Sequence, residues 1–80
     1  MELSAMIKGD ARLFSFVVRE EDRGKVGKLP LSGSARVICC YRDGEFMLVD
    51  GESTLKKGDE VVVLTHSDTV PKLSEQWARR

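Results

Sequence analysis

The stretch RVICCYR-DG-EFMLVD, residues 36–50, decides the fold. Two apolar segments rich in β-branched and aromatic residues flank the dipeptide Asp43-Gly44, and such a dipeptide favours a tight turn with positive φ. The sequence therefore predicts that a strand over residues 36–42 folds back antiparallel onto a strand over residues 45–50. The remaining predictions are built around this hairpin.

Two further segments predict strands, and the C-terminal segment predicts a helix. Residues 11–19 (ARLFSFVVR) and 60–65 (EVVVLT) are rich in aromatic and β-branched residues. Ser67 or Asp68 can then cap a helix. Its apolar residues recur at helical spacing: Val70, Leu73 and Trp77. We expect an α+β fold with two layers, a four-stranded, mostly antiparallel sheet and a C-terminal helix.

Eighty residues leave room for one small domain. Residues 1–10 end at Gly9-Asp10, where a turn is natural, and we interpret them as the remnant of a linker. The domain itself is expected over residues 11–80. Residues 20–28 (EEDRGKVGK) are charged and contain two glycines, so they predict a surface connection between the first two strands.

The predicted strands are apolar on both faces. In the second strand, Ile38 and Cys40 would lie on one face. Val37, Cys39 and Tyr41 would lie on the other. An antiparallel sheet in a small domain usually alternates apolar and polar residues because one face meets water. A single helix covers one face, so we expect a second copy or the rest of a parent protein to cover the other. For a dimer, the candidate interface residues are Val37, Cys39 and Tyr41. The alternative is that the N-terminal segment or the loop before the second strand covers it.

The charge balance disfavours nucleic-acid binding. Lysine plus arginine and aspartate plus glutamate each number 13, so the net charge is zero and no excess positive field holds a phosphate backbone. Residues 56–59 (KKGD) before a valine-rich strand also occur in small RNA-binding barrels, which remain an alternative. The N-terminus lacks the pattern of a signal peptide and no apolar run approaches the roughly 20 residues of a membrane span, so we expect a cytoplasmic chain.

The candidate catalytic and metal-binding residues do not form a recognised pattern. His66, Ser67 and Asp68 are adjacent, whereas the members of a catalytic triad converge from separate elements. Cys39 and Cys40 are neighbours that point to opposite faces of a strand, and with one histidine they are too few for structural zinc. The acidic pairs and runs, residues 20–22 and 59–60, are expected on the surface. The sequence therefore predicts no catalytic residue, no metal and no enzyme.

Four segments, in this order and spacing, carry a resemblance to a known family. They are Leu29-Pro30-Leu31, residues 42–45 (RDGE), residues 49–55 (VDGESTL) and residues 57–64 (KGDEVVVL). Over residues 11–77 the chain resembles the TrkA C-terminal (RCK-C) domain. The family has a longer connection after its first strand, whereas residues 20–28 run directly into Leu29-Pro30.

The resemblance implies a non-catalytic regulatory domain of a potassium uptake protein of the Trk or Ktr type, or of a cation antiporter. Such domains form homodimers, follow a dinucleotide-binding domain in the parent protein and act on a membrane transporter, which places them at the cytoplasmic side of the membrane. Some members bind a small ligand such as cyclic di-AMP between protomers, but no ligand-binding residues transfer to this sequence. The alternatives are a purely structural dimerisation module and the RNA-binding barrel.

Overall fold

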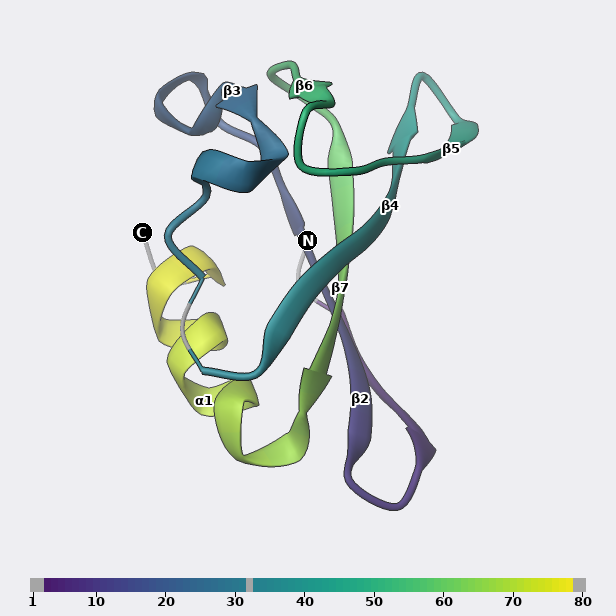
Figure 1. Ribbon diagram of the computed structural model, residues 1–80, viewed down its shortest axis with the longest axis vertical. Coiled ribbons are helices and arrows are strands. Elements are labelled where there is room, and N and C mark those ends of the chain that lie inside the picture. The colour runs from purple at the N-terminus through teal and green to yellow at the C-terminus, as the bar shows by residue number, and fades with distance from the viewer. Residues whose placement is uncertain (1–2, 32, 79–80) are drawn as a thin grey trace.

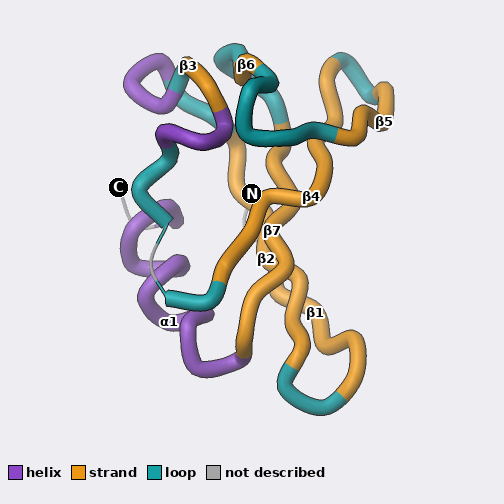
Figure 2. Tube along the Cα trace, in the orientation of Figure 1, coloured by secondary structure: helices purple, strands orange, loops and turns teal. Residues whose placement is uncertain are grey.

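Within residues 3–31 and 33–78, which the computed structural model describes, five antiparallel strands form one sheet in the order β1-β2-β7-β4-β5. These strands are β1 (Leu3–Lys8), β2 (Ala11–Val17), β4 (Ala35–Arg42), β5 (Glu45–Leu48) and β7 (Glu60–His66). A small second sheet pairs β3 (Gly24–Lys25) with β6 (Thr54–Leu55). Figures 1 and 2 show the main sheet curled like half of a barrel, with the small sheet near one end.

The helical parts of the chain are short. Single 3-10 turns span Glu20–Asp22 and Val26–Lys28 in the connection between β2 and β4. The C-terminal helix begins as a 3-10 turn over Ser67–Thr69, continues as α1 (Val70–Leu73) and widens into π-helical turns over Ser74–Ala78. None of the helices in the described ranges is long and apolar enough to cross a bilayer.

The predicted hairpin between residues 36–42 and 45–50 is confirmed. Cys40 pairs with Met47 and Arg42 pairs with Glu45. Asp43 and Gly44 both have positive φ, 52° and 81°, as a type I′ turn requires. The second strand of the hairpin ends at Leu48 rather than at residue 50.

The prediction of four strands is wrong, and the fold is mostly β. Leu3–Lys8, which we assigned to a linker, forms β1 and pairs antiparallel with β2 across a turn at Gly9, where φ is +57°. The small β3-β6 sheet was also not predicted, because two-residue strands leave no periodic signal. Residues 1–2 and 79–80, which the expected linker and domain include, lie outside the described residues.

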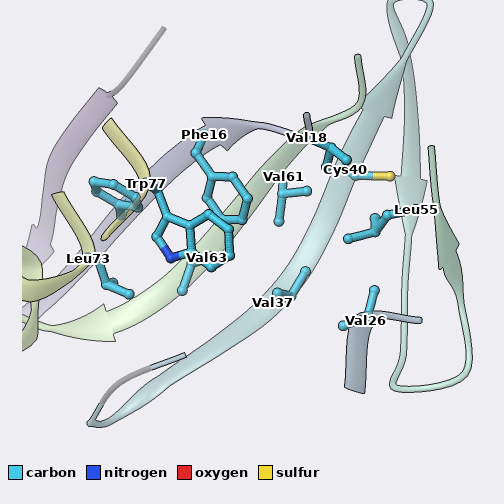
Figure 3. Packing of buried hydrophobic residues seen from close by; sticks show 11 residues of the cluster. Phe16, Val18, Val26, Val37, Cys40, Leu55, Val61, Val63, Leu73 and Trp77 are labelled. Carbon is cyan, nitrogen blue, oxygen red and sulfur yellow. The ribbon is translucent and has the colours of Figure 1, made fainter. Parts of the chain in front are cut away.

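The core lies on the concave side of the sheet. Phe14, Val63 and Val37 are cross-strand neighbours on this side. Leu73 and Trp77 of the C-terminal helix pack against it, which confirms the predicted apolar stripe of the helix. The Trp77 ring stacks on Phe16 at 4.2 Å between centroids. Figure 3 shows this packing continuing to Leu55 and Val26 at the other end of the core.

Gly33 is held where no side chain fits. Its φ is +62°, and an added Cβ would lie 2.6 Å from Oγ1 of the buried Thr69. We expect Gly33→Ala to lower the free energy of unfolding by about 2 kcal/mol, measured by chemical denaturation. Gly9→Ala is the matched control, because Gly9 has a similar φ and no described atom within 4 Å of the added Cβ. Equal losses for the two variants would show that contact with Thr69 has no cost.

Candidate functional site

The convex side of the main sheet, here called the outer face, presents three rows of cross-strand neighbours. The first row is Leu13, Leu64 and Arg36. The middle row is Ser15, Val62, Cys39 and Leu48. The third row is Val17, Glu60, Tyr41 and Phe46. Eight of these eleven residues are apolar or aromatic, counting cysteine, and each row crosses at least three strands.

The outer face exposes large apolar side chains to solvent. Their exposed fractions are Val17 40%, Leu64 40%, Tyr41 41%, Phe46 56% and Leu48 78%. The rings of Tyr41 and Phe46 meet edge to face at 5.8 Å between centroids. The C-terminal helix packs on the concave side, so it leaves this surface uncovered (Figure 1). The expectation that one helix covers only one of two apolar faces agrees with this arrangement.

A β-bulge changes the membership of the predicted interface. Val37 pairs with Val63, but Cys39 already pairs with Val62, so Ile38 is an extra residue on β4. The alternation therefore shifts: Val37 is buried in the core, whereas Cys39 and Tyr41 remain on the outer face. Placing Val37 with them was wrong, because a bulge is not visible in a period-two pattern. Ile38, assigned to the opposite face, lines the outer face beside Cys39.

A shallow depression of about 290 Å³ lies at the centre of the outer face. Its lining includes Leu13, Ser15, Ile38, Cys39, Glu60 and Val62. The Ser15 hydroxyl is buried there and has no hydrogen-bond partner among the described residues. A buried hydroxyl without a partner costs free energy, and this one is shielded from solvent by its own chain.

The two cysteines point to opposite faces, as the sequence predicted. Cys39 pairs with Val62 on the outer face, and Cys40 pairs with Val61 in the core. Both thiols are free. Burial raises the pKa of each thiol above its ordinary value. The thiols therefore stay protonated near neutral pH and are poor nucleophiles and metal ligands.

A larger cavity of about 520 Å³ lies between β4, the turn Val26–Lys28 and the loop after β5. Its lining is mixed: the apolar side chains are Val26, Leu29, Leu31, Ala35, Val37 and Val49, and Arg36 and Asp50 also line it. The amide of Gly27 donates to the carbonyl of Gly51 at 2.9 Å and joins two of its walls. The volume lies in the range of small-ligand sites. The sequence analysis missed this cavity because its walls come from loops without periodic patterns.

The motif residues Arg42 and Asp59 form an ion pair beside the small sheet, in which the Asp59 carboxylate is buried and the Arg42 side chain is partly exposed. Arg42 donates from Nε to Oδ1 of Asp59 at 2.9 Å and from Nη2 to Oδ2 at 2.7 Å. Arg42 also donates to the carbonyl of Thr54, and the Lys56 amide donates to Asp59. The Arg42 hydrogen bonds hold the pKa of Asp59 below its ordinary value despite burial. The prediction of a surface position for Asp59 is therefore wrong.

The other acidic run also contains one structural carboxylate. Asp22 is buried, and its Oδ2 accepts from the Arg19 amide at 3.0 Å, whereas Glu20 and Glu21 are exposed as expected. Asp22 was assigned to the surface, and that assignment is corrected by this capping contact. The sequence carried no usual capping signal here, because Arg19 at the N-cap is not among the residues preferred at that position.

The adjacent His66, Ser67 and Asp68 do not form a catalytic triad. His66 Nδ1 accepts from the Asp68 amide at 3.1 Å, so the imidazole, rather than Ser67 or Asp68, caps the helix. Asp10 and Asp68 lie 3.6 and 3.7 Å from its two nitrogens, and all three side chains are largely exposed. No group of three metal-ligating side chains converges in the described part of the chain.

The aromatic side chains are divided between the core and the outer face. Phe14, Phe16 and Trp77 are buried in the core, as the sequence analysis expected. The exposed rings are Tyr41 and Phe46, which pack against each other at one edge of the outer face.

Comparison with protein-family models and with curated proteins finds no match for this chain. The site is therefore interpreted from its own residues.

Proposed function

We propose that this chain is a non-catalytic regulatory and dimerisation domain of a potassium uptake protein of the Trk or Ktr type, or of a cation antiporter. The observation that carries the proposal is the apolar outer face, which no described helix covers. A surface of this kind marks an interaction site in a small domain. The proposed partner is a second copy, and a preceding dinucleotide-binding domain and a membrane transporter are proposed for the parent protein.

The arrangement of the motif segments supports the resemblance to the TrkA C-terminal domain. Arg42 of the RDGE segment and Asp59 of the KGDE segment form the ion pair, and the carbonyl of Thr54 accepts from the same guanidinium. Leu55 of the VDGESTL segment lies in the core. The motif residues Arg42, Thr54 and Asp59 thus lie together in one corner of the fold.

The large cavity is the proposed receptor for a regulatory ligand, for which cyclic di-AMP is the first candidate. Its apolar side chains suit a flat heterocycle, although Arg36 and Asp50 also line it. Ala35 and Val37 of its wall belong to β4, which also contributes Cys39 and Tyr41 to the outer face. A ligand changes a transporter only if it binds one arrangement of protomers more tightly than another. The bulge in β4 lies between the cavity and the outer face and is a physical connection between them.

Thermal unfolding with cyclic dinucleotides tests ligand sensing. We expect cyclic di-AMP at a hundred-fold excess over its Kd to stabilise the protein by about 2.7 kcal/mol, which raises Tm by roughly 10 °C or more. Leu31→Gln, in the cavity wall, should abolish the shift. Ile7→Gln, at an exposed residue outside the cavity and the three rows, should keep it.

Light scattering over a dilution series completes this test. A dimer that shows no shift with any cyclic dinucleotide would make the chain a purely structural dimerisation module and overturn ligand sensing. A monomer that shows no shift would overturn the whole proposal. Salt-sensitive binding of single-stranded RNA would favour the RNA-binding barrel instead.

A further inference from the structure

We infer that a second copy of this chain packs face to face on the outer face, about a twofold axis that runs along the middle row. This inference rests on the proposed dimerisation and specifies its surface and geometry. In a face-to-face pair of sheets the axis lies in the plane of contact, so each copy presents the same surface to the other. An axis along the middle row exchanges the first row of one copy with the third row of its partner.

The two charged residues of the outer face fit this exchange. Arg36 lies in the first row and Glu60 in the third. The first and third rows are four residues apart along β7, roughly 13 Å, so the two charges are separated within one copy. Neither has an ion pair or hydrogen bond to another described side chain. Face-to-face packing brings Arg36 of each copy onto the third row of the other, one strand from Glu60.

The twofold symmetry produces the contact between Arg36 and Glu60 twice in each dimer. Each dimer forms two equal contacts between a first-row arginine and a third-row glutamate, at the two edges of an apolar centre. Arg36 also comes to lie over the third-row ring of Tyr41, where a cation–π contact is possible. In a parallel arrangement, with first row on first row, like charges would face each other. The charge pattern therefore selects the antiparallel arrangement.

The apolar residues of the outer face are paired by the same exchange of first and third rows. Leu13 of the first row comes to lie over Val17 of the third row, and the middle rows of the two copies face each other. The depression beside Ser15 lies on the axis, so the depressions of the two copies face each other.

Charge reversal tests the arrangement in the full chain. We expect Arg36→Glu and Glu60→Arg each to raise the Kd of the dimer at least ~10-fold, measured by sedimentation, because each substitution places like charges together twice. The double variant restores opposite charges across the interface and should return to within about 3-fold of the original Kd. Circular dichroism should show that all three variants are folded, since both positions lie outside the core.

Cross-linking provides a second readout of the axis. Leu48 lies on the middle row beside the free Cys39 and is exposed, so in a Cys39→Ser background Leu48→Cys should be cross-linked to itself by a short bifunctional maleimide. Ile7→Cys is the control, because Ile7 is exposed but lies on β1, outside the three rows. A dimer unaffected by charge reversal and not cross-linked through residue 48 would overturn this geometry and leave the proposed dimerisation standing. A monomeric unmodified protein would overturn both.

Discussion

Replacing Val63 with aspartate should prevent folding, whereas the same substitution at the neighbouring Leu64 should give a folded monomer. Val63 is fully buried between Phe14 and Val37 on the concave side. A carboxylate there loses its hydration without a partner, at a cost comparable to the whole stability of a domain of this size, about 5–10 kcal/mol. Leu64 lies on the outer face, where a charge stays hydrated in the monomer and is dehydrated only by a partner.

The two variants differ in position by one residue, so they compare the two faces of one strand. Circular dichroism should show loss of the cooperative thermal transition for Val63→Asp and its retention for Leu64→Asp. Light scattering should show the monomer mass for Leu64→Asp at concentrations where the unmodified chain is dimeric. If Leu64→Asp is dimeric with unchanged Kd, the outer face is not the contact between copies.

Strong local signals made the central part of the fold predictable. The Asp43-Gly44 dipeptide fixes a turn with two positive φ values, and the flanking apolar segments then pair in only one register. The helix was predictable because Leu73 and Trp77 must lie on one side of it to be buried. In both cases the constraint is contained within about fifteen consecutive residues.

The bulge at Ile38 and the first strand were not predictable in the same way. A bulge is a tertiary adjustment between β4 and β7, and the sequence around Ile38 is uniformly apolar, so nothing in it marks the extra residue. Leu3–Lys8 is a strand because β2 offers it an edge, and its own composition is mixed. The bulge also affected the predicted dimer-interface residues, because the single inserted residue moved Val37 to the core.

The sequence predicted that an uncovered apolar face exists, but it did not predict how the residues of that face are arranged. Counting apolar residues on both faces indicated that one face would be left uncovered, and the exposed fractions of Phe46 and Leu48 agree with that reasoning. The opposed positions of Arg36 and Glu60 depend on the register between β4 and β7, which sequence spacing does not define. The same limit applies to the contact between Arg42, at the end of β4, and Asp59, just before β7, which lie 17 residues apart in sequence.

Removing Arg42 should destabilise the protein far more than removing an exposed cation. Arg42 neutralises the Asp59 carboxylate, whose side chain is only 2% exposed, and holds the Thr54 carbonyl of the small sheet. Without it, a buried charge is left with one backbone donor, from Lys56. We expect Arg42→Ala to lower Tm by roughly 10 °C or more. Lys25→Ala, which breaks the exposed pair with Glu52, should change Tm by less than about 2 °C.

The pH dependence of stability should identify the same carboxylate. Hydrogen bonds from Arg42 lower the pKa of Asp59 in the folded state, so the unfolded chain binds the proton more readily. The contribution of Asp59 is therefore present above its unfolded pKa of about 4 and is lost as the pH falls through the lower folded value. Asp59→Asn should lower Tm at pH 7 and should reduce the fall in Tm between pH 5 and the acid range.

A double-mutant cycle distinguishes the ion pair from simple loss of packing. If the cost of Arg42→Met comes from an abandoned carboxylate, Arg42→Met combined with Asp59→Asn should be less destabilised than the sum of the two single variants. Asparagine keeps an oxygen for the Lys56 amide, so the comparison isolates the charge. Strictly additive losses in Tm would mean that Arg42 and Asp59 stabilise the corner independently, and that their shared hydrogen bonds contribute little.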